Sequence, residues 1–263
     1  MTATYPWTRA LVTGASSGIG RAIAERLAGA GVEVVAVARD GERLDKVAAD
    51  LPVDVEVLAA DLAEPAQVAR VERRLASADR PVDLLVNNAG FGTYGNFADL
   101  DIDGEQREIL VNVVAVVRLT HAAVRAMLAR GRGAILDIGS VSGLQATPGN
   151  AVYGATKSFV ASFGEAVHGE LEGTGVSLTT VLPGFTRTEF AARAGIEGRP
   201  IPGPAWQSPE QVAEAALDAA RAGKAWHVTG PFNQVLVAMS TPVPRGIKRR
   251  VAARLARRTN PPR

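Results

Sequence analysis

The stretch Thr13-Gly14-Ala15-Ser16-Ser17-Gly18-Ile19-Gly20 separates a short apolar run at residues 10–12 from a helical pattern that begins at residue 21. Gly14 permits a tight turn after a strand, Gly18 lets the backbone approach a bound pyrophosphate, and Gly20 lets the following helix pack closely on a sheet. The amides and the positive end of that helix would then face the phosphates. The spacing of the glycines differs from G-x-G-x-x-G, so the stretch predicts a dinucleotide-binding turn of another type.

Apolar runs alternate with helical patterns along most of the chain. The expected strands are at residues 10–13, 33–38, 54–59, 84–87, 134–139, 177–182 and 226–229. The expected helices are at residues 20–29, 41–50, 65–78, 104–130, 150–172 and 208–221. The strand runs are short and mostly lack polar alternation, as in strands covered on both faces. This order predicts an α/β fold with a single doubly wound parallel sheet of Rossmann type, flanked by helices on both faces.

Length and composition agree with one soluble domain. We expect it to span residues 1–244 of the 263, followed by a basic tail at residues 245–263. The chain has no cysteine, and its three histidines lack ligand spacing, so we predict neither disulfides nor a metal site. The N-terminus lacks a basic region followed by an apolar run, and no segment holds about 18 uninterrupted apolar residues. We therefore expect a cytoplasmic protein.

Tyr153 and Lys157 lie four residues apart in a helical pattern, so their side chains share one face of the helix. The Lys157 ammonium could then stabilise the phenolate of Tyr153 and lower its pKa from the usual value of about 10. Ser140 follows the apolar run at residues 134–139, which would place its hydroxyl at the carboxyl edge of the sheet. The three residues together predict a carbonyl reductase, although a Tyr–Lys pair at this spacing also arises by chance.

These motifs resemble those of the short-chain dehydrogenase/reductase family. The resemblance covers about residues 9–190 and implies reduction of a carbonyl by hydride transfer from a nicotinamide cofactor. It implies that Tyr153 is the general acid, that Ser140 steadies the developing alkoxide and that Lys157 also binds the nicotinamide ribose. For Asn112 it implies a water-holding role in a proton relay to Lys157; the alternative is a simple hydrogen bond between helices. The matching runs are Thr13 to Gly20, Asn87-Asn88-Ala89-Gly90, Asn112, Ser140, Tyr153-x3-Lys157 and Pro183-Gly184.

The end of the second expected strand favours NADP(H) as the cofactor. The position of Ala38 lacks the acidic side chain that would bind the ribose of NAD, and Arg39 follows, where its guanidinium could meet a 2′-phosphate. The alternative is a solvated Arg39, with Asp40 on the ribose. The resemblance adds an adenine contact for Asp61 and a nicotinamide contact for Thr188. The predicted cofactor-binding residues are Gly14, Ser16, Ser17, Gly18, Ile19, Gly20, Arg39, Asp61, Leu62, Asn88, Ala89, Gly90, Tyr153, Lys157, Pro183, Gly184, Thr186 and Thr188.

Residues 189–209 are expected to form a lid over the substrate. They include Phe190, Ile196, Ile201 and Trp206 among glycines and prolines, which favours an apolar substrate. The alternative is that these side chains only pack the loop onto the domain. A similarity to reductases of actinobacterial lipid metabolism in the region of residues 88–112 points to a lipid-like 3-oxoacyl substrate. The alternatives are a small ketone, quinone or alcohol, or an NADP(H)-binding sensor or interaction protein without catalytic activity.

The basic charge is concentrated at the C-terminus. Residues 245–263 hold eight basic residues and no acid, so the other 244 residues carry a net charge of −6, from 21 basic and 27 acidic residues. Ile247, Val251 and Leu255 form a narrow apolar stripe, which suggests weak contact with an anionic membrane surface; the alternative is a solvated end. The tail lacks interleaved aromatic residues, so we expect no nucleic-acid binding. The family resemblance implies a homodimer or homotetramer.

Overall fold

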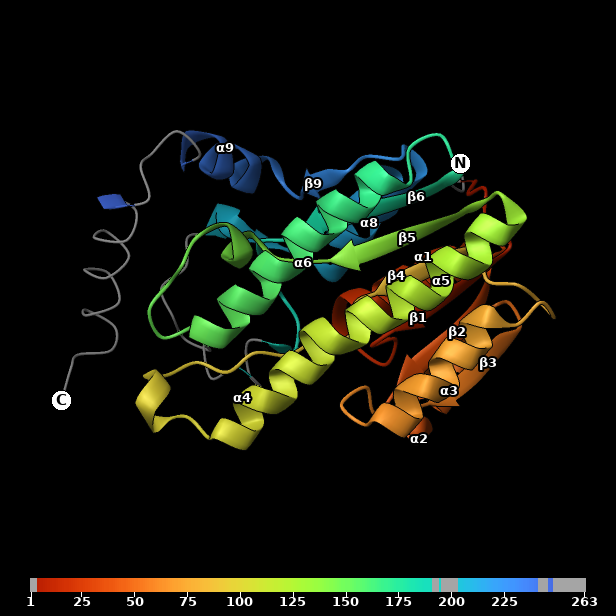
Figure 1. The fold of residues 1–263 in the computed structure, drawn as a ribbon, viewed down its shortest axis with the longest axis horizontal. Coiled ribbons are helices and arrows are strands. Elements are labelled where there is room, and N and C mark those ends of the chain that lie inside the picture. Colours follow the sequence, from red (N-terminus) through yellow and green to blue (C-terminus); the bar gives the residue numbers. More distant parts are fainter. Residues whose placement is uncertain (1–3, 191–193, 195–202, 241–245, 248–263) are drawn as a thin grey trace.

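The centre of the computed structural model is a parallel β-sheet (Figure 1). Within the described residues 4–190, 194, 203–240 and 246–247, seven strands form it in the order β3-β2-β1-β4-β5-β6-β9. The order reverses between β1 and β4, which makes the sheet doubly wound, as the sequence predicts. The strands are β1 (Arg9–Thr13), β2 (Glu33–Ala38), β3 (Val55–Ala59), β4 (Leu84–Asn87), β5 (Gly133–Ile138), β6 (Val176–Leu182) and β9 (Trp226–Val228).

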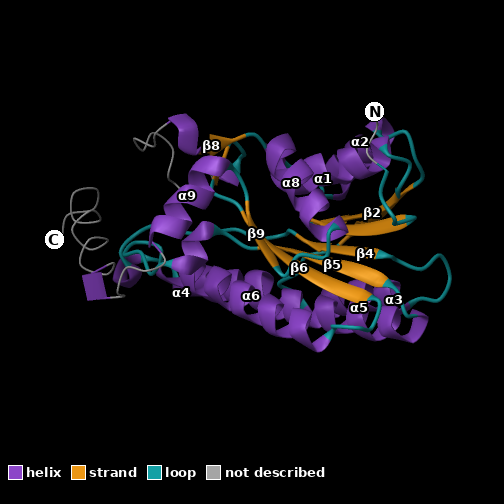
Figure 2. Cartoon of the chain, turned by 90° about the horizontal axis from the view of Figure 1, so that it is seen from above, coloured by secondary structure: helices purple, strands orange, loops and turns teal. Residues whose placement is uncertain are grey.

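Helices cover both faces of this sheet, as Figure 2 shows from above. One face carries α1 (Gly18–Gly29), α2 (Gly41–Asp50) and α8 (Pro209–Arg221). The other carries α3 (Pro65–Ala76), α5 (Val116–Arg130) and α6 (Ala151–Glu170). The predicted Rossmann-type fold is therefore confirmed.

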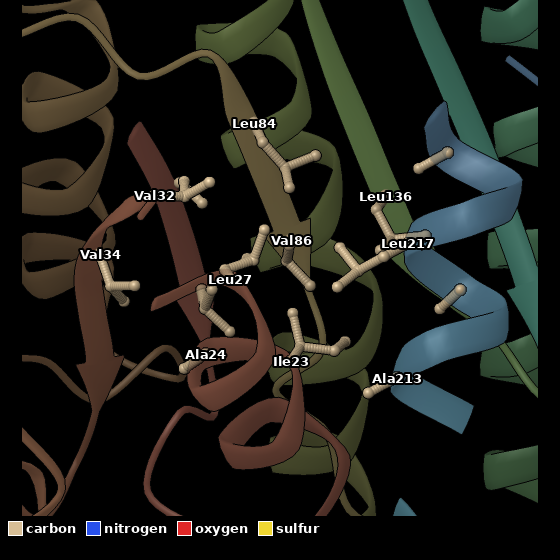
Figure 3. Close-up of a cluster of buried hydrophobic side chains, with 14 of the residues drawn as sticks. Ile23, Ala24, Leu27, Val32, Val34, Leu84, Val86, Leu136, Ala213 and Leu217 are labelled. Carbon is tan, nitrogen blue, oxygen red and sulfur yellow. The ribbon is translucent and has the colours of Figure 1, made fainter. Parts of the chain in front are cut away.

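A hydrophobic cluster lies on each face of the sheet. In the first, Leu27 of α1 and Leu217 of α8 pack with Val86 of β4, and all three side chains are fully buried (Figure 3). In the second, Leu85 of β4 packs with Leu119 of α5. Because neighbouring residues of a strand point to opposite faces, Leu85 and Val86 serve the two clusters. This explains why the central strands read as continuous apolar runs.

Local sequence determines where several helices begin and end. The Asp40 side chain caps α2 by accepting a hydrogen bond from the Arg43 amide at 3.0 Å. Ser208 and Gln211 form a capping box at the start of α8. Gly131, with φ of 66°, ends α5 in the left-handed conformation. Where an expected helix or strand is found, its ends differ from the prediction by at most two residues, apart from the long helix described next.

The single helix predicted at residues 104–130 consists of three parts. They are α4 (Ile102–Ile109), a π-helical turn (Leu110–Ala115) that contains Asn112, and α5. Taken together, Ile102–Arg130 is long and apolar enough by length and composition to cross a membrane. However, α5 packs against α3 and against β4 and β5, so this stretch is accounted for as a core helix of the sheet.

Two features near the C-terminus are absent from the sequence prediction. One is a small parallel pair of strands, β7 (Phe185–Thr186) and β8 (Trp206–Gln207); the other is α9 (Pro231–Ser240). Part of the expected lid, including Ile196 and Ile201, lies outside the described residues. The same holds for all of the expected tail except residues 246–247.

Candidate active site

A cavity of about 690 Å³ follows the carboxyl edge of the sheet, from the glycine turn after β1 to the segment after β6. It is lined by Ser140 and by all predicted cofactor-binding residues except Gly20. Asn112 does not line it either. The structure therefore gathers residues from both halves of the sheet around one space, at the point where the strand order reverses.

The glycine turn has the shape that the sequence predicts. Gly14 and Gly18 have φ of 69° and 55°, which side chains other than glycine rarely adopt. Gly20 lies beneath the turn, where a Cβ atom would collide with the Gly14 carbonyl oxygen and the Asn88 amide. Gly20 therefore allows close packing and does not face the cavity.

The start of α1 fits an anionic ligand. Ser17 is the N-cap residue, but its side chain makes no capping hydrogen bond, and the first turn contains no acidic residue. Ser16, Ser17 and Gly18 line the cavity at this point. The free amides and the positive end of the helix dipole therefore face a space that a pyrophosphate could fill.

Asn88 braces the glycine turn in addition to lining the cavity. Its side-chain amide donates to the Thr13 carbonyl at 2.9 Å. The backbone amides of Asn88 and Ala89 donate to the Thr13 hydroxyl at 2.9 and 3.0 Å. These contacts tie the ends of β1 and β4 together, so Asn88 holds the glycine turn in place.

Charged residues surround the end of the cavity beyond β2. Arg39 is exposed and lines the cavity, whereas the Asp40 side chain is engaged as the cap of α2. Arg43 also lines the cavity but is paired through both guanidinium NH groups with the Glu189 carboxylate. Arg39 is thus the residue of this group that best fits the predicted phosphate contact.

Asp61 and Leu62 line the cavity after β3, as predicted for an adenine site. The Asp61 carboxylate forms an ion pair with Arg107 of α4 and accepts a hydrogen bond from the Ala63 amide at 3.0 Å. Both partners hold the side chain at the wall of the cavity. Arg107 was not identified from the sequence.

Ser140, Tyr153 and Lys157 meet at the inner part of the cavity. Tyr153 and Ser140 lie close together, and hydrogen bonding with Ser140 favours a lower pKa of the phenol. Lys157 is buried, its Nζ atom lies 5.8 Å from the centre of the Tyr153 ring, and it donates to the Ile138 carbonyl at 2.8 Å. The predicted shared helix face is therefore present. The phenol, a hydroxyl and an ammonium group converge here, as acid catalysis on a carbonyl oxygen requires.

Asn112 lies behind this group. Its amide donates to the Phe91 carbonyl at 2.8 Å and to the Thr156 hydroxyl at 3.1 Å, and its oxygen accepts from the Phe91 amide at 3.2 Å. Asn112 thus joins the π-helical turn to α6 and to the segment after β4. These bonds include the contact between helices that was considered as the alternative role; the water-holding role stays a prediction.

Residues 8–197 match the sequence profile of the family described as short chain dehydrogenase. The chain belongs to the short-chain dehydrogenase/reductase family. It is 41% identical over 184 residues to sulfoacetaldehyde reductase 2 of Chromohalobacter salexigens, covering 68% of this chain and 73% of the relative. It is 35% identical over 239 residues to the 3-oxoacyl-(acyl-carrier-protein) reductase of Escherichia coli, covering 86% and 97%. A short-chain dehydrogenase from Sphingobium yanoikuyae, solved in complex with NADPH, superimposes with a TM-score of 0.81 at 38% identity, covering 93% and 95%.

Burial determines the charge states of Tyr153 and Lys157 in this dehydrogenase. It raises the pKa of Tyr153 to about 12, although the bond with Ser140 acts in the opposite direction. It lowers the pKa of Lys157 to about 8, against the attraction of Asp137 and Glu108. The expectation of a lowered phenol pKa is therefore wrong for the free protein, because the loss of water around the phenol outweighs the hydrogen-bonding effect of Ser140. The phenol stays protonated at neutral pH, as a general acid must.

Sequence reasoning missed two buried glutamates beside the catalytic group of this dehydrogenase. Glu105 and Glu108 of α4 are 2% and 0% exposed. The Thr93 hydroxyl donates to both carboxylates, and the Thr93 amide donates to Glu108 at 3.1 Å. Each glutamate also has one buried carboxyl oxygen without a hydrogen-bond partner. In the sequence they lie in a strongly charged segment that reads as an exposed helix face.

The segment after β4 packs directly on Tyr153. A Cβ atom on Gly92 would lie 2.7 Å from Cδ2 and 2.9 Å from Cγ of Tyr153. Phe190, from the start of the expected lid, covers the Tyr153 ring with a centre-to-centre distance of 5.3 Å. The Tyr153 ring is thus packed against both the Gly92 backbone and the Phe190 ring.

The turn after β6 is supported by α9. The buried Asn233 side chain lies against Gly184, where any Cβ atom would collide with it. The Thr186 hydroxyl donates to the Gly184 carbonyl at 3.2 Å, and the Thr188 hydroxyl accepts from the Phe190 amide at 3.2 Å. The predicted nicotinamide-binding turn therefore packs on α9, a helix that was not expected from the sequence.

Proposed function

We propose that this dehydrogenase reduces a ketone or aldehyde to an alcohol with NADPH. The observation that carries the proposal is the convergence of Tyr153, Ser140 and Lys157 at the inner part of a dinucleotide-sized cavity. NADPH, when bound, supplies the hydride that reduces the carbonyl carbon. The glycine turn and the start of α1 would hold its phosphates.

Tyr153 then protonates the oxygen of the reduced carbonyl. Its raised pKa keeps the proton on the phenol until negative charge develops on the substrate oxygen. Ser140 donates a hydrogen bond to the same oxygen, and the Lys157 ammonium favours the phenolate that remains after proton transfer. The bonds of Asn112 to Phe91 and Thr156 keep these groups in position.

The preference for NADPH rests on Arg39. It lines the cavity, is exposed, and follows Ala38, which brings no negative charge to the ribose. A guanidinium pairs well with a phosphate through two parallel hydrogen bonds. The use of Asp40 as the cap of α2 disfavours the alternative in which that carboxylate binds the ribose of NAD.

An apolar substrate is favoured by the aromatic residues around the inner cavity. The lining includes Phe91, Phe185, Phe190 and Trp206, and the Phe190 ring contacts the Tyr153 ring in a tilted arrangement. Such a wall suits an acyl chain better than a charged group. We therefore propose a lipid-like 3-oxoacyl substrate, which agrees with the name of the Escherichia coli relative.

The decisive experiment follows NADPH oxidation with 3-oxoacyl substrates of increasing chain length, with small aldehydes and ketones, and with NADH in place of NADPH. We expect the rate to rise with chain length and to require NADPH. Tyr153→Phe should lower kcat by about 10²- to 10⁴-fold, the range for loss of a general acid, and still bind NADPH. Tyr153→Phe turnover equal to that of the unaltered protein would overturn the mechanism. Activity confined to small carbonyls would overturn only the substrate assignment.

Exposed apolar residues on the Ile102–Arg130 stretch and on α6 favour a homodimer. Ile109, Val114 and Leu128 of the Ile102–Arg130 stretch and Phe159 of α6 are 42, 39, 42 and 42% exposed. Self-association through these helices would cover them, and a symmetric contact would use the same patch on both copies. Light scattering after gel filtration should give twice the monomer mass. Cytoplasmic location is part of this proposal.

A further inference from the structure

The last described helix exposes an apolar stripe. In α9, Phe232, Val235, Leu236 and Met239 are 40, 58, 56 and 71% exposed. Their spacing at i, i+3, i+4 and i+7 puts them on one side of the helix. The helix has no charged residue, and Asn233 is its only buried residue. Four apolar side chains in such a row are costly to leave in water, which indicates a surface that something covers.

This α9 stripe lies close to the entrance of the catalytic cavity. α9 packs against the short 3₁₀ turn Gly203–Ala205, which leads directly into Trp206 at the cavity wall. Trp206 in turn contacts Phe185, at 5.7 Å between ring centres, and Phe185 is 44% exposed. Figure 2 shows α9 at the same end of the molecule as β8. Apolar side chains are therefore exposed both on the helix and at the cavity rim.

The charge of the sequence beyond α9 indicates what covers the stripe. Residues 245–263 carry eight basic residues and no acid, and α9 itself carries no charge. An apolar helix followed by a dense basic segment matches the two signals that bind a protein to an anionic bilayer, apolar insertion and attraction to the headgroups. We propose that α9 and the basic tail dock on an anionic membrane surface and turn the cavity entrance toward it.

A second copy of the chain fits this surface less well. A symmetric contact through α9 would bring two tails of eight positive charges close together, and like charges repel. An anionic bilayer neutralises these charges while it covers the stripe. Docking does not depend on the proposed activity; only delivery of a lipid-like substrate to the cavity rests on it.

The test is flotation of the full chain with vesicles of phosphatidylcholine alone and of phosphatidylcholine with phosphatidylglycerol. We expect binding to the anionic vesicles only, with a decrease at high salt. The double variant Leu236→Glu, Met239→Glu should lose about 10-fold or more in partitioning, because it places two charges in the apolar stripe. The matched control is Trp226→Glu, an exposed aromatic residue on β9 that lies outside α9, outside the cavity lining and outside the helices proposed to pair, and this variant should bind like the unaltered chain.

Two readouts separate the possible results. Turnover of a water-soluble short-chain substrate should be the same for the double variant and the unaltered chain, so a failure of docking is distinguishable from a failure of the reductase proposal. Equal binding to neutral and anionic vesicles, or no effect of the double variant, would overturn the proposal. The proposal would also be overturned if neither protein floated with vesicles and gel filtration showed that the unaltered chain is a dimer and the double variant a monomer.

Discussion

Thr93 donates its backbone amide to the fully buried carboxylate of Glu108 at 3.1 Å, and this bond anchors the segment that packs on Tyr153. The Thr93 hydroxyl adds bonds to Glu105 and Glu108. Because Gly92 precedes Thr93 and lies against the Tyr153 ring, the two glutamates position the phenol indirectly. They are positioning residues that act through a loop.

The charge of Glu108 should make stability depend on pH. Burial raises its pKa from 4.5 to about 7, with a further increase from Glu105, against the bonds from Thr93 and the attraction of Lys157. The folded chain then holds this proton more tightly than the unfolded chain. Its stabilising contribution is complete below about pH 4.5 and is lost as the pH rises through about 7.

Glu108→Gln should remove this part of the pH dependence. We expect the decrease in the free energy of unfolding between acidic and neutral pH to shrink by up to about 3 kcal/mol, measured by urea denaturation. The pH dependence that arises from buried Asp137 should remain, because burial also raises the pKa of this carboxyl to about 7. Glu165→Gln, at an exposed position of α6, is the control. An unchanged slope in Glu108→Gln would contradict the assignment.

Gly92→Ala should impair catalysis more than binding of NADPH. The added methyl group would lie 2.7 Å from the Tyr153 ring, so either the segment or the phenol must move. Such crowding typically costs about 1–3 kcal/mol, which corresponds to a decrease in kcat of about 10- to 100-fold if the phenol moves. Gly154→Ala is a matched control next to the tyrosine, because its Cβ atom would meet only the Ser142 carbonyl at 3.6 Å. Equal kcat values for the two variants would refute the predicted role of the segment.

Arg39→Ala should weaken NADPH binding and leave NADH binding nearly unchanged. Loss of charge-assisted hydrogen bonds to a phosphate costs about 1.5–3 kcal/mol, so KM for NADPH should rise about 10- to 100-fold. The control is Lys46→Ala, which removes another exposed cation from nearby α2 outside the cavity lining. If both variants raise KM equally, the effect is one of general charge and Arg39 is not the phosphate contact.

Carbonyl reduction should slow as the pH rises above about 8. Burial lowers the pKa of Lys157 to about 8, so its ammonium loses a proton in this range, while Tyr153 with a pKa of about 12 stays protonated. Since kcat/KM reports groups of the free enzyme, its pH profile should show this descending limb. Lys157→Arg, which cannot lose its charge, should lose the limb even if its overall rate is lower. A profile flat to about pH 10 would argue against the neutralisation of Lys157.

The glycine turn and the Tyr153–Lys157 pair could be predicted because their chemistry depends on local spacing. Gly14 and Gly18 are needed wherever the backbone takes a left-handed turn, and residues four apart on a helix share a face in any fold. The doubly wound parallel sheet could be predicted similarly from the alternation of apolar runs with helical patterns. These features need no knowledge of what packs on them.

The roles of Glu105, Glu108 and α9 could not be predicted because they depend on packing between distant segments. The two glutamates lie in a segment with several charges, and only contact with Thr93 shows that they are buried. The phenol pKa was mispredicted for the same reason, since burial of Tyr153 is a property of the whole fold. α9 carries no charged residue, so its exposed apolar side and the side that buries Asn233 could not be distinguished from the sequence.

The π-helical turn at Leu110–Ala115 rotates the side chains of α4 about the helix axis relative to those of α5. A wider turn accommodates an extra residue, so everything before it is rotated by about 100° relative to an ordinary α-helix. The part before the turn thereby presents Glu108 to the loop at the catalytic centre, while the part after it presents Leu119 to the sheet. Removing a single residue from the turn would align the faces of α4 and α5. Either Glu108 would then no longer face the loop, or Leu119 would no longer face the sheet.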